Sequence, residues 1–171
     1  TIENILSNNS GRHWDFASDY IGMAVGARDK TGYSIGLGQD ASPGTTWAYN
    51  NSAIQTLSAV LREATGQEAR DFARTQLLDP IGMTNSTMTL DDSGNTRMFS
   101  GLQTTCLDLA RFGYLMLNHG NWNGKQVVSS DYVRRATQQS STTLNSAYGL
   151  LWWLNRNGTI ASTTDVITGK G

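Results

Sequence analysis

Apolar residues that recur at helical spacing are the feature that most limits how this chain can fold. The clearest such stretch spans 52–64, and Gly66 follows it as a typical C-terminal stop. A second strong stretch spans 105–118, where Thr105 and Asp108 have the spacing of a capping box. We expect these two helices to pack at the centre of a mostly helical unit.

Shorter patterns add further elements around these two helices. Ser18 or Asp19 could cap a helix that runs to about residue 27, and Thr1 could cap the first helix. One face of the 105–118 helix would be apolar through Leu107, Ala110, Tyr114 and Leu117. The other predicted helices span 2–7, 29–37, 68–78 and 131–138, and the predicted short strands span 86–90, 126–128 and 148–155. The expected fold class is therefore mainly α with a few short strands, and no linker divides residues 1–171.

The composition excludes several functional classes. The 171 residues carry a net charge of −1 without clustered Lys or Arg, so we expect neither nucleic acid nor an anionic membrane surface as a partner. No apolar run approaches the roughly 20 residues that span a bilayer, and the N-terminus has no signal-peptide pattern. The single cysteine, Cys106, excludes an internal disulfide and lies in a helical pattern beside Leu107, which favours a buried structural thiol.

The stretch 47–51, Trp-Ala-Tyr-Asn-Asn, combines two polar side chains at a predicted loop-to-helix junction. The phenol of Tyr49 could transfer a proton, and the amide of Asn51 could donate and accept hydrogen bonds at once. A structural interpretation is equally available, with a core aromatic residue followed by an asparagine N-cap. The pentapeptide by itself leaves both interpretations open.

Five segments, in the same order, resemble the serine β-lactamase-related family. This family includes class C β-lactamases, DD-peptidases, β-lactamase-like esterases and 6-aminohexanoate-dimer hydrolases. Residues 1–11 resemble its T-I-x-x-L-L-x-x-x-S-G segment, and residues 43–51 resemble P-G-x-x-[FW]-x-Y-[SN]-N. The other three matches are 77–83 with P-L-G-M, 101–113 with G-G-x-x-[ST]-x-x-D-L-A-[RK]-F, and 148–153 with Y-G-[LY]-G-W.

The resemblance implies acyl transfer through a covalent acyl-enzyme, without a cofactor. In the family, the serine of a Ser-x-x-Lys motif attacks a carbonyl carbon. The tyrosine of a Tyr-x-Asn motif takes and returns the proton, and the asparagine holds the substrate and orients the lysine. Tyr49 and Asn51 match those two positions. A free phenol has a pKa of about 10, so Tyr49 would need a neighbouring ammonium group to act as a base at neutral pH.

The chain departs from the family pattern in two important respects. It contains no Ser-x-x-Lys, because the residues three positions before Lys30, Lys125 and Lys170 are Ala27, Trp122 and Ile167. A Lys-Thr-Gly or His-x-Gly motif is also absent after Trp153. We therefore expect residues 1–171 to form the helical lobe of an α/β, β-lactamase- or DD-peptidase-like (transpeptidase-like) hydrolase. This lobe would be truncated at both ends and inactive by itself.

Three other functions are compatible with parts of the sequence. A non-catalytic substrate-binding or sensor lobe of a penicillin-binding-like protein would use Tyr49 and Asn51 only as hydrogen-bonding groups. A metal site could be built from His13, Asp15 and Asp19, although their spacing matches no strong ligand motif. Catalysis by Cys106 and His119 is disfavoured, because thirteen helical positions separate them by about 19 Å.

The remaining expectations concern the substrate, the partners and the location. The substrate would be a small molecule or peptide with a reactive carbonyl, and Trp47 and Trp14 could line its acyl side. The other lobe of the full-length protein would be a partner, and the apolar face that it covers could cause self-association. The resemblance favours a bacterial periplasmic or secreted protein.

Overall fold

We obtained a computed structural model that describes residues 1–138 and 144–154, and it is mostly helical. The first half contains α1 (Ile2–Leu6), the π-helix η1 (Ala17–Gly26), α2 (Lys30–Gly36), α3 (Asn51–Gln55) and α4 (Leu57–Thr65). After them follow α5 (Ala69–Ala73), the π-helix η2 (Arg74–Leu78), the 3₁₀-helix η3 (Asp79–Ile81), α6 (Cys106–Leu117) and α7 (Ser130–Ala136). This confirms the expected mainly α fold with a few short strands.

Two short antiparallel hairpins complete the described structure. Strand β1 (Thr87–Met88) pairs with β2 (Leu102–Gln103), and β3 (Asn121–Trp122) pairs with β4 (Lys125–Gln126). The second hairpin turns at an Asn-Gly pair, as the sequence predicts.

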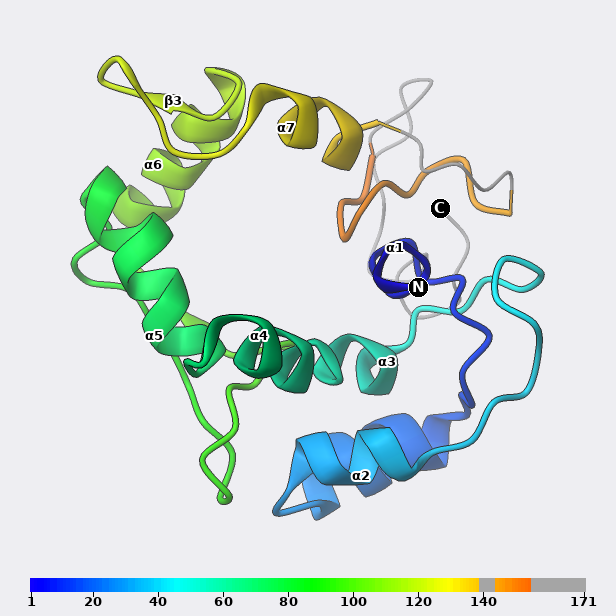
Figure 1. Ribbon diagram of the computed structural model, residues 1–171. Coiled ribbons are helices and arrows are strands. Elements are labelled where there is room, and N and C mark those ends of the chain that lie inside the picture. The colour runs from blue at the N-terminus through cyan, green and yellow to red at the C-terminus, as the bar shows by residue number, and fades with distance from the viewer. Residues whose placement is uncertain (139–143, 155–171) are drawn as a thin grey trace.

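The elements follow one another around an arc from α2 through α3, α4 and α5 to α6 and α7 (Figure 1). The segment 144–154 connects α1 with α7 at one end of this arc, because the backbone N–H of Leu151 donates to the carbonyl of Leu6 at 2.8 Å. The N–H of Leu150 donates to the carbonyl of Ala136 at the end of α7, at 3.1 Å. Residues close to the C-terminal end of the described chain therefore lie beside α1.

Side-chain caps mark the starts of several helices in the local sequence. Thr1, Thr105 and Ser129 each accept a hydrogen bond from a backbone N–H in the first turn of the helix that follows. The predicted cap at Ser18 or Asp19 was wrong, because η1 begins at Ala17, before both residues, and has no side-chain cap.

The predicted helix 52–64 is present, but it is interrupted at Thr56. The Thr56 hydroxyl donates to the carbonyl of Ala53 at 2.6 Å, and α3 ends at Gln55 before α4 begins. The predicted helix 68–78 is divided in a similar way, into α5 and the wider turns of η2. The two segments that flank Thr56 are therefore separate helices, and only α3 follows the Tyr49 loop directly.

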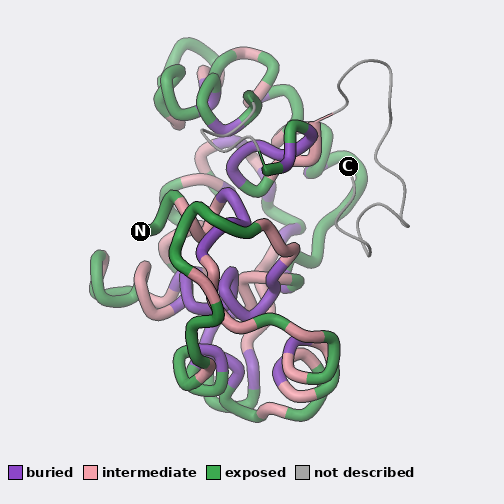
Figure 2. Tube along the Cα trace, turned by 90° about the vertical axis from the view of Figure 1, so that its right-hand side faces the viewer, coloured by how far each residue is buried: buried purple, intermediate pink, exposed green. Residues whose placement is uncertain are grey.

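The main apolar core lies around η3 and α6 rather than between α4 and α6. Leu115 of α6 is fully buried there, and Phe112 packs against the same cluster. α4 contacts α3 and α5, whereas α6 contacts η3 and β3, so the two long helices belong to different packing groups. Both helices were expected to pack at the centre of the lobe, and each instead packs with its own set of neighbours. Figure 2 shows buried stretches in the middle of the molecule and exposed turns at its periphery.

The predicted apolar face of the 105–118 helix is exposed in the structure. Leu107, Tyr114 and Leu117 are more than half exposed, while Asp108 and Leu115 are buried. Cys106, the first residue of α6, is exposed as well, so the prediction of a buried thiol was wrong. Helical spacing identified the helix, but both sides of α6 carry apolar residues, so spacing did not identify which side packs inward.

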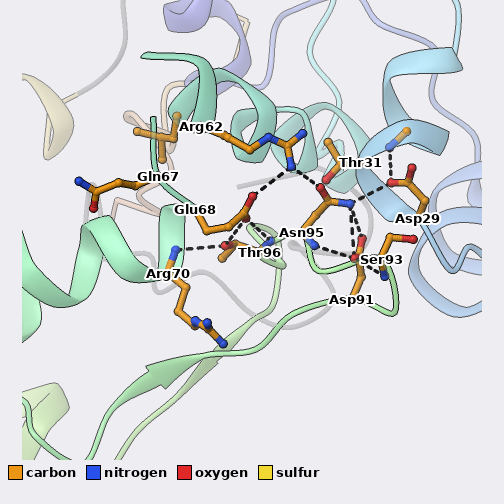
Figure 3. A network of polar contacts seen from close by, with 12 residues as sticks. Asp29, Thr31, Arg62, Gln67, Glu68, Arg70, Asp91, Ser93, Asn95 and Thr96 are labelled. Atoms are coloured by element: carbon orange, nitrogen blue, oxygen red, sulfur yellow. Dashed lines mark hydrogen bonds and ion pairs between the residues drawn. The ribbon is translucent and has the colours of Figure 1, made fainter. Parts of the chain in front are cut away.

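A polar network joins α2, α4 and the 91–96 loop (Figure 3). The amide of Asn95 donates to Asp29 at 3.0 Å and accepts from Arg62 of α4 at 2.8 Å. Arg62 also pairs with Glu68 at 3.0 Å, and Glu68 accepts from Thr96. Since these groups satisfy one another, the network fixes α4 relative to α2 without apolar packing.

The predicted strand 148–155 is a tight turn over its described part. The backbone N–H of Gly149 donates to the carbonyl of Trp152 at 2.8 Å, and Tyr148 pairs with Trp153 across the turn. Leu151 has a positive φ of 61°, a conformation that no regular strand contains. Asn155 lies outside the described residues, as does the predicted turn at Asn157-Gly158.

Candidate active site

Tyr49 lies at the end of a loop whose position is set by Asn8. The carbonyl of Asn8 accepts the backbone N–H of Ala48 at 3.0 Å, and its side-chain Oδ1 accepts that of Asn50 at 3.1 Å. Asn8 adopts a left-handed conformation with φ 55°, which asparagine tolerates better than most residues. One residue of the α1 region thus holds both neighbours of Tyr49.

The ring of Tyr49 belongs to a cluster of four aromatic side chains. It stacks on Trp153 with ring centroids 5.7 Å apart, and it meets Tyr148 edge to face at 6.2 Å. Trp47 contacts both Tyr148 and Trp153 at 5.5 and 5.9 Å. The tight turn at 148–153 therefore brings the C-terminal aromatic motif onto Tyr49, and the half-buried phenol ring contacts Trp153 and Tyr148.

Partial burial raises the pKa of the Tyr49 hydroxyl above its usual value of 10.0, and the nearby Tyr20 and Asp19 add to this rise. The indole N–H of Trp153 hydrogen-bonds the phenol and acts in the opposite direction. The net rise keeps Tyr49 protonated at neutral pH in this chain. It would need a cation close to its oxygen before it could act as a base.

Asn51, the first residue of α3, is held by the buried carboxylate of Asp19. Its side-chain Nδ2 donates to Asp19 Oδ2 at 2.8 Å, and its backbone N–H donates to the same oxygen at 3.3 Å. The backbone N–H and the hydroxyl of Ser52 donate to Asp19 Oδ1 at 2.6 and 2.7 Å. The side chain that caps α3 is that of Asn50, whose Oδ1 accepts the N–H of Ala53 at 2.7 Å.

The other predicted site residues lie apart from this arrangement. Within the described residues, Trp14 makes none of the ring contacts of the Tyr49 cluster, whereas Trp47 is part of it. His13 is bound by Asp15 at 2.7 Å and by Asp40 at 2.9 Å, and Asp19 faces α3 instead. In the described part of the chain, no group of three or more His, Cys, Asp or Glu could hold a metal ion.

Lys30, the lysine closest to Tyr49 in sequence, binds backbone carbonyls at the end of η1. The ammonium group of Lys30 donates to the carbonyls of Met23 and Ala27 at 3.2 and 2.8 Å, at the end of η1. Lys125 is exposed in β4, and Lys170 lies outside the described residues. Over 1–138 and 144–154, no helix is both long enough and apolar enough to cross a bilayer.

Sequence reasoning missed two residues that position the motif, Asp19 and Asn8. Asp19 was considered as a helix cap and as a metal ligand, and it acts instead on a helix 32 positions away. An acidic residue inside an apolar helical pattern was the available signal, because an isolated buried carboxylate requires partners. Asn8 offered only a weaker signal, because asparagine tolerates the left-handed conformation that often ends a helix.

Comparison with known proteins defines first the fold and then the family. A Bacillus anthracis protein assigned as a 6-aminohexanoate-dimer hydrolase superimposes with a TM-score of 0.75 at 24% identity, over 92% of this chain and 47% of that one. The octameric penicillin-binding protein homologue from Pyrococcus abyssi gives a TM-score of 0.64 at 18% identity, over 88% and 42% of the two chains. The fold is therefore that of one part of the β-lactamase and penicillin-binding-protein class.

The Beta-lactamase family model matches residues 1–169, so the chain belongs to this family. The unguisins hydrolase ungD' from Aspergillus campestris is 32% identical over 96 residues, which cover 54% of this chain and 18% of that protein. The chain thus spans less than half the length of each of these three proteins, and the Bacillus anthracis and Aspergillus campestris proteins are named as hydrolases.

Proposed function

We propose that the chain is one lobe of a serine hydrolase that forms an acyl-enzyme on an amide, β-lactam or ester substrate. Tyr49 and Asn51 would be its Tyr-x-Asn motif. The observation that carries the proposal is their joint geometry. The Tyr49 phenol lies two residues before α3, in the aromatic cluster, and the Asn51 amide is fixed at the first position of that helix.

The proposed chemistry needs a serine and a lysine from the rest of the protein. The serine oxygen attacks the substrate carbonyl carbon and its proton passes to the Tyr49 oxygen; Tyr49 then protonates the leaving group. Burial raises the pKa of Tyr49, and the lysine ammonium would lower it again by stabilising the phenolate. Because this chain has no Ser-x-x-Lys, we expect it to be inactive by itself.

A substrate-binding or sensor lobe is the second candidate, and the protonation state of Tyr49 favours it. A phenol that keeps its proton at neutral pH can bind a substrate oxygen without taking part in catalysis. The reading frame on both sides of residues 1–171 separates the two candidates, because a Ser-x-x-Lys upstream of Thr1 would supply the nucleophile and its absence would leave a binding lobe.

Tyr49→Phe in the full-length protein tests the catalytic role directly. We expect kcat to fall by at least about a hundredfold while KM changes little, since the ring and its stacking remain and only the proton-transferring oxygen is lost. Nitrocefin and p-nitrophenyl esters would distinguish lactamase from esterase activity. The matched control is Tyr132→Phe on α7, which should retain wild-type kcat. Unchanged turnover in Tyr49→Phe would reject the proposal.

A further inference from the structure

We infer that Asp19 is a positioning residue for the Tyr-x-Asn motif. Its buried carboxylate fixes the Asn51 amide in a single orientation, with Nδ2 bound to Asp19 and Oδ1 turned away from it as an acceptor. This inference rests on the proposed function of Tyr49 and Asn51, and it adds a residue that acts through them rather than on the substrate.

The orientation follows from what a carboxylate can do. An ionised carboxylate only accepts hydrogen bonds, so the Asn51 group that faces Asp19 at 2.8 Å must be the amide nitrogen. Rotating the amide by half a turn would bring its oxygen against Asp19 Oδ2 and leave two acceptors in contact. Asp19 thereby leaves the Asn51 oxygen available to accept a hydrogen bond from a lysine ammonium or from a substrate N–H.

The contacts around Asp19 also fix the backbone that carries the amide. The carboxylate is only 1% exposed and takes backbone N–H bonds from both Asn51 and Ser52, so a shift of α3 would leave a buried charge without partners. The carboxylate reaches α3 from η1, a different element. Lys30 holds the far end of η1 through the carbonyls of Met23 and Ala27.

The Asp19 charge acts on Tyr49 as well as on Asn51. Burial is the largest contribution to the raised pKa of Tyr49, and the charges of Tyr20 and Asp19, both on η1, raise it further. On the other side of the ring, Trp153 opposes the rise through its hydrogen bond, and Tyr148 lies edge to face. Removing the Asp19 charge should therefore lower the pKa of Tyr49.

The decisive comparison uses Asp19→Asn and Asp19→Glu in the full-length enzyme. Asp19→Asn keeps the shape but allows the facing amides to turn over, so kcat should fall by about tenfold to a hundredfold with KM changed little. The acidic limb of its pH–rate profile should move to lower pH. Asp19→Glu keeps the charge and displaces the oxygens, so kcat should fall without that movement.

Asp108→Asn is the matched control. Asp108 is also a fully buried carboxylate, and it holds the backbone N–H of Asn85 and the hydroxyl of Ser86 at 2.9 Å each. Asp108→Asn should lower the melting temperature as much as Asp19→Asn does. When rates are divided by the concentration of folded enzyme, kcat and the pH–rate profile should not change. Equal losses of kcat in Asp19→Asn and Asp108→Asn would overturn the inference and leave Asp19 with a purely structural role.

NMR of the 171-residue chain tests the contact without any variant or activity. The side-chain amide protons of Asn51 and the backbone amide of Ser52 should exchange far more slowly than the side-chain amide of the exposed Asn123. Fast exchange at Asn51 would contradict the fixed orientation. Wild-type turnover in Tyr49→Phe with slow exchange at Asn51 would instead reject the proposed function and leave the contact intact.

Discussion

Asn8 and Asn50 are joined by a hydrogen bond of 3.1 Å from the backbone N–H of Asn50 to the side-chain oxygen of Asn8. The Asn8 carbonyl also binds Ala48, so Tyr49 is held between two anchored peptide groups. The chain therefore fixes the backbone of the proposed proton-transferring residue from both sides, independently of the aromatic contacts of its ring.

Asn8→Gly should reveal how much this anchor contributes. Glycine accepts the positive φ of 55° without strain, but the substitution removes the buried side chain with its Oδ1 hydrogen bond and leaves a buried N–H of Asn50 unpaired. We expect the free energy of unfolding to fall by about 1–3 kcal/mol in urea titrations. Asn123→Gly, at an exposed position with φ 49°, is the control and should change it by less than about 0.5 kcal/mol.

Gly149→Ala should be strongly destabilising, because the tight turn at 148–153 leaves no room for a side chain. A Cβ at this position would lie 2.2 Å from the carbonyl oxygen of Ala136 and 2.7 Å from that of Gln138, both of them backbone atoms. Gly113→Ala in α6 meets nothing within 4 Å and should stabilise the helix by about 0.5–1 kcal/mol. Melting temperatures that move in the same direction for both variants would contradict the geometry of the turn.

The contribution of His13 to stability should depend on pH. Hydrogen bonds to Asp40 first, then to Asp15, raise the pKa of His13 above its usual 6.5. A pKa that is raised by folding gives stability that is fully present below about 6.5 and is lost as the pH rises through the folded value. Wild type should thus lose its advantage over His13→Gln between about pH 6 and about pH 9.

Melting temperatures across that range measure the effect, and His119→Asn is the control. Backbone and side-chain hydrogen bonds from Ser18 lower the pKa of Asp15 below 3.8, and its bond to His13 lowers it further, so the Asp15 contribution is lost only at more acidic pH. A difference between wild type and His13→Gln that stays constant from about pH 6 to about pH 9 would show that the imidazolium charge is unimportant.

The exposed apolar stripe of α6 should promote self-association of the isolated chain. Leu107, Tyr114 and Leu117 lie on one side of this helix, and Leu117 is 77% exposed. We propose that the other lobe of the full-length protein covers part of this apolar surface. Leu117→Glu should shift the sedimentation profile towards the monomer without lowering the melting temperature. A wild-type chain that sediments only as a monomer would argue against the proposal.

Local signals in the sequence specified the helices well, and tertiary contacts decided the rest. Thr1 and Thr105 cap their helices as expected, because capping depends only on neighbouring residues. The break at Thr56 and the turn at Leu151 are set by hydrogen bonds that a periodicity argument does not contain. The exposed side of α6 was misjudged because apolar residues occur all around that helix.

In the proposed site, too, the sequence identified some residues and only the structure identified the others. Tyr49 and Asn51 were identified through a resemblance that extends over five segments, and their catalytic roles remain predictions. The carboxylate that orients Asn51 could not be identified, since Asp19 and Asn51 come together only when η1 packs against α3. Trp153 was expected in a strand, and the turn at 148–153 brings it onto the Tyr49 ring instead.

The stacking of Tyr49 on Trp153 also gives the protein an internal optical reporter. Tyrosinate absorbs where tryptophan emits, so a Tyr49 that loses its proton with its ring 5.7 Å from the Trp153 indole would quench the Trp153 fluorescence by energy transfer. The ionisation of this single phenol can thus be followed by emission intensity, with Tyr49→Phe as the blank. The same signal would report the arrival of a lysine ammonium beside Tyr49 when the missing lobe is supplied.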